Sequence, residues 1–482
     1  MNQAIRNMWI AAVALFVVML GSLTYVQFFA AADLNANPLN TRQLYREFDL
    51  PRGAILVDGK PIAESVAKEG GDFKYQRKYL EPELYAHITG FYSLAYGTRH
   101  LESTLNKELS GQSDSLFYDR MVNLITGGTS EGASVELTID GDLQKKVYDA
   151  LPDGKQATAI VTDPKTGNIL AMVSKPSYDP NVLAVHSTSQ ATANMNKILE
   201  TTGLSPNINP AVGHLIAPGS TFKLIPLIAS LESGKYNVND TYDNPTQITL
   251  PGTNTSLSNF REGICSQQTT ADLSFIIAQS CNTPFVTMSQ NVGEEAIRAT
   301  AERFGFGKDL QIPMRVTASV FPDDIDAAQL AMSSIGQYNT KATPLQMNMV
   351  AMGIANDGVV MKPNIIKKVT ASDLRVLQEP KPEEFSTATT KQVADQVTEL
   401  MRQPVKSGTA RKAAVEGVDL AAKTGTADIG TSGLVNGWIT GFAPADNPQV
   451  AVTVVVERVT YDESRGTSSS IMKKILEAVF NK

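Results

Sequence analysis

Three short patterns in the chain contain the residue types that acyl transfer requires: a serine nucleophile, lysine bases and carboxylate-binding hydroxyls. They are Ser-x-x-Lys, Ser-x-Asn and Lys-Thr-Gly, which together form the signature of a class of serine acyl enzymes. Each pattern recurs by chance, at 65–68, 220–223 and 470–473, at 205–207, 280–282 and 289–291, and at 165–167 and 423–425. Order along the chain and local context must therefore select the functional copies.

Among the Ser-x-x-Lys copies, Ser220 has the context that nucleophilic chemistry needs. Pro218-Gly219 interrupts the chain, and an apolar helical run begins at Ser220. A serine at a helix N-terminus lies close to free backbone N–H groups, and Lys223, three residues on, shares its helix face. Burial and a neighbouring cation would lower the pKa of Lys223 and let it act as a general base. The alternative is an N-capping serine beside a solvated lysine.

The third pattern is assigned to Lys423-Thr424-Gly425-Thr426, which continues the apolar run 418–422 and predicts a strand. A strand edge can present Lys423 and the threonine hydroxyls to a carboxylate, and a backbone N–H to an oxyanion. The other copies lack this context. Lys165 falls in a predicted hairpin turn, Ser65 lies near the membrane-proximal end, and Ser470 opens a terminal helix without a preceding Pro-Gly.

Alternating and helical patterns predict the elements that hold these residues. Two apolar runs around the turn 163–167 predict a hairpin, and two further strands and a helix are expected near the C-terminus. The predicted strands span 134–139, 159–161, 169–173, 438–442 and 450–456, and the predicted helices span 143–151 and 470–480. Strands at both ends of a helical middle favour one antiparallel sheet in an α+β domain.

The N-terminal segment predicts a membrane anchor. Residues 9–29 carry no charged side chain, and a helix of that length is about 31 Å long, which matches a hydrocarbon core. Arg6 precedes the run and Asp33 is the first charge after it, so the short tail is expected in the cytoplasm. The alternative is a signal peptide cleaved at Ala30-Ala31-Ala32. The apolar core of a signal peptide is usually shorter than the run at residues 9–29, which favours the anchor. Either way, the rest of the chain is exported.

Two cysteines in an exported chain favour a disulfide over a thiol catalyst. Cys265 and Cys281 are 16 residues apart, and closing that loop is worth about 3 kcal/mol in the entropic model. Two buried free thiols are the alternative.

Composition excludes several classes of protein. The 482 residues carry a formal net charge of −7, which argues against a protein that coats nucleic acid. The four histidines and two cysteines lack the spacing of metal ligands, so no metal site is predicted.

With these motifs in order, the chain resembles the class B penicillin-binding proteins, in particular their smaller actinobacterial kind. The resemblance covers nearly everything after the anchor. The matching residues are Asn40, Arg42, Arg52-Gly53, 87–91, Gly97, Leu101-Glu102, 137–140, 159–163, Gly167, Ala171-Met172, 217–223, 280–283, 334–337, 343–347 and 423–427.

The resemblance implies a penicillin-binding serine acyl-transferase fold of the α+β class, with a five-stranded antiparallel sheet flanked by helices and an all-helical subdomain. It also implies a non-catalytic α+β pedestal and one transmembrane helix. The expected domains are 1–32 for tail and anchor, 33–133 for a pedestal or dimerisation-like domain and 134–482 for the transpeptidase domain. The pedestal is too short for a glycosyltransferase domain, so a monofunctional enzyme is expected.

The implied reaction is peptidoglycan D,D-transpeptidation. Ser220 would attack the D-Ala-D-Ala carbonyl of a stem peptide, Lys223 would take its proton, and an amine of a second strand would resolve the acyl-enzyme. Ser280 would relay a proton to the leaving amine, and Asn282 would hold Lys223 and the substrate amide. Lys423, Thr424 and Thr426, around Gly425, would bind the terminal carboxylate, with the N–H groups of Ser220 and Thr426 as the oxyanion hole.

Two features depart from the family pattern. Ala422 stands where the family often has glycine, which would narrow the strand edge, and Cys281 fills the variable middle of the second motif. We hypothesise that a Cys265–Cys281 bond would tether that loop and position Ser280.

The implied partners are peptidoglycan stem peptides, β-lactam antibiotics, the membrane, a polytopic glycan polymerase of the SEDS family and division or elongation proteins. No cofactor and no nucleic acid is expected. The catalytic domain would lie on the extracytoplasmic side of the cell membrane.

Two alternatives remain: a hydrolase, either a D,D-carboxypeptidase or a β-lactamase, and a β-lactam-binding sensor or inactive scaffold. A β-lactamase needs neither pedestal nor anchor. A sensor needs a cytoplasmic signalling part. An inactive scaffold should lack a motif residue, whereas all the motif residues are present in this chain.

Overall fold

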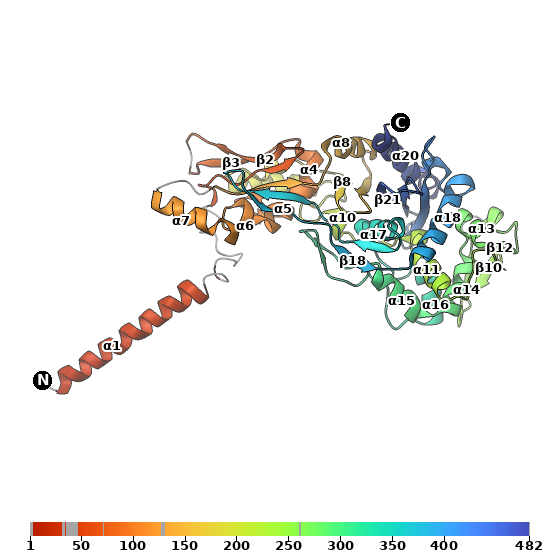
Figure 1. Ribbon diagram of the computed structural model, residues 1–482, viewed down its shortest axis with the longest axis horizontal. Helices are drawn as coiled ribbons and strands as arrows, with labels where there is room; N and C mark the ends of the chain where they lie inside the picture. Colours follow the sequence, from red (N-terminus) through yellow and green to blue (C-terminus); the bar gives the residue numbers. More distant parts are fainter. Residues whose placement is uncertain are drawn as a thin grey trace.

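The structure is a computed structural model that describes residues 3–30, 34, 47–70, 72–126, 131–259 and 262–481. Figure 1 shows an elongated molecule in which the N-terminal helix projects from one end, helices of the C-terminal half form the other end, and the sheet of that half lies between. Asn40, Arg42, the residues Ala31-Ala32 of the alternative cleavage site, and part of the predicted boundary loop lie outside the described residues.

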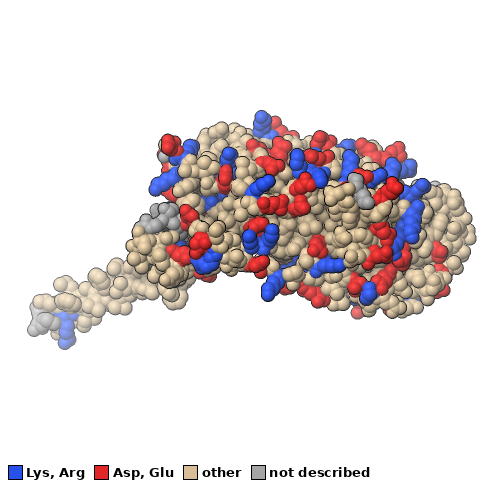
Figure 2. All heavy atoms as spheres, turned by 45° about the horizontal axis from the view of Figure 1, so that its top comes forward, with Lys and Arg blue, Asp and Glu red and all other residues tan. Residues whose placement is uncertain are grey.

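The predicted anchor is one helical rod. Helix α1 (Gln3–Thr24) continues into a π-helical turn, η1 (Tyr25–Phe29), and its side chains are exposed. Within the described residues, Gln3–Phe29 is the helix long and apolar enough to cross a membrane. Figure 2 shows an uncharged rod with one basic side chain near its tip, whereas acidic and basic side chains are intermixed on the visible face of the body.

The membrane-proximal half is built on a six-stranded sheet in the order β17-β16-β6-β1-β2-β3. The strands are β1 (Ile55–Val57), β2 (Lys60–Ala67), β3 (Tyr75–Tyr79), β6 (Ser134–Leu137), β16 (Ile366–Thr370) and β17 (Val376–Gln378). The predicted domain boundary after residue 133 coincides with the start of β6, so the sheet runs across it. Strand β16 pairs with β6, which brings a hairpin from the C-terminal half into the same sheet.

Short helices and a strand pair complete this half. They are α4 (Pro82–Thr89), β4 (Tyr92–Ser93), β5 (Gly97–Thr98), α5 (His100–Thr104), α6 (Asn106–Leu109), η2 (Asp114–Leu116) and α7 (Phe117–Thr126). A buried ion-pair cluster joins them to the sheet. The carboxylate of Glu102 accepts hydrogen bonds from Arg52 Nε at 2.5 Å and Arg77 Nε at 2.6 Å, and all three side chains are buried.

The other half contains the predicted five-stranded antiparallel sheet, in the order β19-β20-β21-β7-β8. Its strands are β7 (Gln156–Thr162), β8 (Ile169–Lys175), β19 (Ala421–Asp428), β20 (Val435–Ala443) and β21 (Val450–Val459). This confirms the hairpin and the two C-terminal strands that the sequence predicts. The two ends of the domain meet where β21 pairs with β7.

Alternation along the strands places a different helix layer on each face of this sheet. In β7, Ala159 and Val161 pack with α8 (Gly141–Ala150) and α20 (Thr467–Phe480), whereas Ile160 belongs to the core on the face covered by α17 (Pro344–Ala355). Strands buried on both faces read as continuous apolar runs, as β21 does.

The helical part lies beyond α17 (Figure 1). It comprises α11 (Leu224–Glu232), α12 (Glu262–Cys265), α13 (Leu273–Gln279), α14 (Thr283–Val292), α15 (Glu294–Arg303), α16 (Ala327–Ser334) and α18 (Lys391–Ser407). The remaining helical segments are η3 (Pro180–Val182), α9 (Thr188–Leu199), α10 (Pro210–Gly213), η4 (Gly219–Thr221), η5 (Arg411–Ala413) and α19 (Tyr461–Ser464).

The expectation of an all-helical subdomain needs correction. Two-stranded ladders join β9 (Thr241–Asp243) to β12 (Thr270–Asp272), β10 (Gln247–Thr249) to β11 (Ser256–Ser258), β13 (Leu310–Gln311) to β14 (Arg315–Val316), and β15 (Val359–Met361) to β18 (Glu384–Thr387). The β10–β11 ladder has a physical reason: the β-branched Ile248 and Thr249 favour extended backbone, and Pro251-Gly252 supplies the turn.

Candidate active site

Ser220 lies in a 3₁₀ turn rather than in the first turn of an α-helix. Turn η4 ends at Thr221, and α11 starts only at Leu224. Pro226 has no N–H to donate to the carbonyl four residues earlier, which explains why the α-helical ladder starts later than the sequence suggests. Trp438 Nε1 on β20 donates to the Ala217 carbonyl at 3.0 Å and fixes the segment leading to Ser220.

Two glycines allow the segment around Ser220 to lie directly against β19. Gly219 has φ 53°, and a Cβ there would lie 2.4 Å from the Thr426 carbonyl oxygen. A Cβ on Gly425 would lie 2.7 Å from the Pro218 carbonyl oxygen. Any side chain at either position would push the two segments apart. The first and third motifs are therefore in backbone contact.

Lys223 is fully buried, and acceptors of the second motif engage all three donors of its ammonium. Its Nζ donates to the Ser280 carbonyl at 2.9 Å, to the Cys281 carbonyl at 2.9 Å and to Asn282 Oδ1 at 2.7 Å. Burial, and then the charge of Lys423, lower the pKa of Lys223 well below its ordinary value. This lysine is therefore poised to lose a proton.

The second motif follows the C-terminus of α13. Ser280 has a left-handed conformation with φ 60°, and the Cys281 N–H returns to the Ile276 carbonyl at 3.1 Å. This turn directs two successive carbonyls at Lys223. A disulfide joins the buried Cys281 to Cys265, with a Cα–Cα distance of 5.8 Å.

Asn282 is held on both of its polar ends. Its Oδ1 accepts from Lys223, its Nδ2 donates to the Ser258 carbonyl at 3.2 Å, and its backbone N–H donates to Asn259 Oδ1 at 2.5 Å. The side chain is thus oriented before any substrate binds.

Lys423 joins the third motif to the second. Its Nζ donates to Ser280 Oγ at 2.7 Å and to the Thr424 carbonyl at 3.0 Å. The side chain is fully buried, and burial lowers the pKa of Lys423 to about 7. Lys423 therefore lies behind Ser280, while Thr424, Gly425 and Thr426 line the open pocket.

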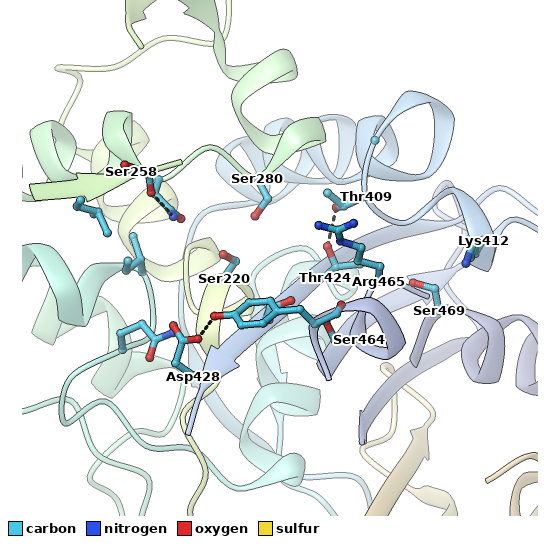
Figure 3. A pocket seen from close by; sticks show the side chains of 18 of the residues that line it. Ser220, Ser258, Ser280, Thr409, Lys412, Thr424, Asp428, Ser464, Arg465 and Ser469 are labelled. Atoms are coloured by element: carbon cyan, nitrogen blue, oxygen red, sulfur yellow. Dashed lines mark hydrogen bonds between the residues drawn. The ribbon is translucent and has the colours of Figure 1, made fainter. Parts of the chain in front are cut away.

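These elements enclose a pocket of about 650 Å³ that contains Ser220, Ser280 and Asn282 on its wall. This volume suits a ligand of drug size. In Figure 3, Ser220 and Ser280 lie near one another at the centre of the view, and Thr409, Thr424 and Arg465 lie to their right. Thr424 Oγ1 donates to Thr409 Oγ1 at 2.5 Å.

The sequence motifs did not reveal a second group of pocket residues. Ser258, Gln337, Thr409, Arg411, Lys412, Asp428, Tyr461, Arg465 and Ser469 also line the pocket. Gln337 ends one of the family-like stretches, but the others carry no motif signal. The Tyr461 hydroxyl donates to the Asp428 carboxylate, and Figure 3 draws this hydrogen bond as the dashed line that ends at Asp428.

The rejected motif copies lie away from this pocket. Ser65 is in β2 of the membrane-proximal sheet, where its Oγ accepts from the Arg52 N–H at 3.1 Å. Lys165 is in the turn between β7 and β8, and Ser470 is in α20 outside the pocket lining.

Comparison with known proteins identifies the family. The penicillin-binding protein transpeptidase domain matches residues 157–477, and the penicillin-binding protein A dimerisation domain matches residues 52–135. The chain is 38% identical to peptidoglycan D,D-transpeptidase PbpA of Mycolicibacterium smegmatis over 95% of this chain and 94% of that protein. It is 36% identical to PbpA of Mycobacterium tuberculosis over 99% and 98%.

Solved structures agree. The ceftriaxone acyl-enzyme complex of penicillin-binding protein A from M. tuberculosis aligns with a TM-score of 0.85 at 34% identity, covering 90% of this chain and 99% of that one. The imipenem acyl-enzyme complex aligns with a TM-score of 0.85 at 35% identity, covering 90% and 100%. The chain belongs to the penicillin-binding protein transpeptidase family, as a class B member similar to PbpA of M. tuberculosis.

Proposed function

We propose that the protein is a monofunctional peptidoglycan D,D-transpeptidase that works through a Ser220 acyl-enzyme and is acylated by β-lactams. The observation that carries this proposal is the buried ammonium of Lys223, three residues after Ser220. Three acceptors from the second motif hold it. The related PbpA proteins are named peptidoglycan D,D-transpeptidases, and the M. tuberculosis protein has been solved as β-lactam acyl-enzymes.

Acylation starts with transfer of the Ser220 hydroxyl proton to Lys223, which must first be neutral. When the ammonium loses one proton, two N–H donors and one lone pair remain, and the lone pair can accept the Ser220 hydroxyl proton. Ser220 Oγ then attacks the carbonyl of the D-Ala-D-Ala bond, and the backbone N–H groups of Ser220 and Thr426 stabilise the oxyanion. The hydroxyls of Thr424 and Thr426, with the charge of Lys423 behind them, bind the terminal carboxylate.

The leaving group then departs with a proton. Ser280 relays to the amine of the leaving D-Ala the proton that Lys223 took from Ser220, and the hydrogen bond from Lys423 orients the Ser280 hydroxyl for this transfer. The C–N bond breaks, and the acyl group stays on Ser220. An amine of a second stem peptide then attacks the ester, forms a new C–N bond and returns a proton to Ser220 Oγ.

We further propose a single-pass topology, with the tail before α1 in the cytoplasm and the two sheets on the extracytoplasmic side. The absence of charged side chains from residues 9–29 and the position of Arg6 before them support this orientation. In this arrangement residues 33–133 act as a pedestal and residues 134–482 as the transpeptidase domain.

A glycan polymerase of the SEDS family, with division or elongation proteins, is the proposed protein partner. An exposed apolar stripe on α7 supports a docking role for the pedestal, because residues four apart share one helix face. The stripe consists of Phe117, Tyr118, Met121, Val122 and Ile125.

The activity is tested by incubating the full chain in detergent with a stem pentapeptide ending in D-Ala-D-Ala, which can serve as donor and acceptor. The proposal predicts a cross-linked dimer and one released D-Ala per cross-link, both absent with Ser220→Ala. Release of D-Ala without a dimer at saturating peptide would instead indicate a carboxypeptidase and would contradict the proposal.

A further inference from the structure

The side of the pocket beyond Thr424 is rich in positive charge that the proposed chemistry does not use. Arg411, Lys412 and Arg465 line it, together with Ser469 in the first turn of α20. In Figure 3, Lys412, Arg465 and Ser469 lie on the Thr424 side of the pocket, on the far side from Asp428.

The N-terminus of α20 opens on this region without a capping side chain. Its N-cap is Gly466, so the free N–H groups of the first turn have no side-chain acceptor there. A helix N-terminus carries a partial positive charge, and α20 has 14 residues.

Lys412 lies against this same N-terminus. A Cβ on Gly466 would lie 2.5 Å from Lys412 Nζ, so the ammonium is in contact with the N-cap. Among the described residues, no carboxylate lies within salt-bridge distance of Lys412 or Arg411, whereas Arg465 pairs with Asp462 at 3.4 Å. A cation beside the positive end of a helix is unfavourable unless an anion lies between them.

Ser469 provides an independent sign of a ligand. The residue is only 2% exposed, yet it lines the pocket, and no described residue forms a hydrogen bond with its Oγ. Figure 3 shows this hydroxyl pointing toward the side where Arg465 and Thr424 lie. This oxygen is not among the fully buried atoms that lack a partner, so it faces the pocket and is available to a bound oxygen atom.

We propose that the N-terminus of α20, Ser469, Lys412 and Arg465 form a second anion subsite, which binds a carboxylate of the acceptor stem peptide. The inference rests on the proposed transpeptidase function. The donor carboxylate is assigned to Thr424 and Thr426, so a second anion site beyond Thr424 belongs to whatever enters after D-Ala leaves. The acceptor amine must approach from the side of the leaving amine, which is this side of the pocket.

The test uses an acyl-enzyme formed from a D-alanyl thioester donor and two acceptor amines, D-alanine with one carboxylate and D-glutamate with two. The ratio of aminolysis to hydrolysis is measured for the wild type, Ser469→Ala and Lys412→Gln. Because hydrogen bonds to a charged group are worth a large factor in affinity, we expect the preference for D-glutamate over D-alanine to fall about fivefold to tenfold in both variants.

Lys473→Gln is the matched control for Lys412→Gln, because it also removes one positive charge. Lys473 is a half-exposed residue of α20 that pairs with Glu477 and lies outside the pocket. An unchanged D-glutamate preference in both Ser469→Ala and Lys412→Gln would overturn the subsite. An equal loss in the rate of acylation by benzylpenicillin would assign the subsite to the donor and would also overturn it. A wild-type protein that forms no acyl-enzyme would overturn the proposed function as well.

Discussion

Lys423 Nζ donates a 2.7 Å hydrogen bond to Ser280 Oγ, which joins β19 to the loop after α13 beneath the pocket. Lys423 carries no acidic partner among the described residues, and it contributes to lowering the pKa of Lys223. Ser280 therefore stands between two lysines, one hydrogen-bonded to its hydroxyl and one to its carbonyl.

Acylation should accelerate as pH rises, because Lys223 must be neutral to accept the Ser220 proton. Burial and Lys423 lower the pKa of Lys223, so a loss of the Lys423 charge should raise it again. We predict that Lys423→Ala slows acylation by benzylpenicillin and moves the acid limb of its pH–rate profile to higher pH. The profile of Lys473→Gln is the control. An acid limb that stays in place or moves to lower pH would contradict this account of Lys223.

Loss of the disulfide should weaken both stability and acylation. The bond closes a 16-residue interval, worth about 3 kcal/mol in the entropic model, and Cys281 presents one of the carbonyls that hold Lys223. Cys265→Ser, which leaves the motif itself unaltered, should lower the melting temperature and slow acylation several-fold. An acylation rate within twofold of wild type would show that the bond does not position Ser280. Non-reducing peptide mass spectrometry that finds two free thiols in the exported protein would have the same meaning.

The Glu102 cluster should be essential for folding of the pedestal. Burial opposes ionisation of Glu102, but the charges of Arg77 and Arg52 outweigh it and hold its pKa below the ordinary value. Glu102→Gln would leave two buried guanidinium groups without a counter-charge, which typically costs about 3–5 kcal/mol. The urea midpoint of unfolding should fall accordingly, whereas the exposed Glu69→Gln should leave it unchanged. A midpoint for Glu102→Gln equal to that of wild type would refute this role.

The sequence was informative where the signal is local. Apolar runs and the turn at Asp163–Gly167 predicted the β7–β8 hairpin, and Pro218-Gly219 with motif order selected Ser220. Non-local pairing left no comparable signal, so the insertion of β16 beside β6 was not predicted, although 229 residues separate Ile366 from Leu137 in that register.

The pocket illustrates the same limit. The serines and threonine at 467–470 carry no pattern that singles them out in the sequence, and Lys412 is 57 residues from Ser469. Only packing of η5 against α20 brings Lys412 and Ser469 into one pocket wall.

The central claim is that Ser220 is the acylated nucleophile, and intact mass spectrometry tests it most directly. The purified chain in detergent is incubated with benzylpenicillin beside Ser220→Ala, and masses are recorded over minutes to hours. The account predicts a long-lived adduct of one β-lactam mass on the wild type and none on the variant. An equal adduct on Ser220→Ala, or rapid consumption of the drug with no adduct on the wild type, would contradict it.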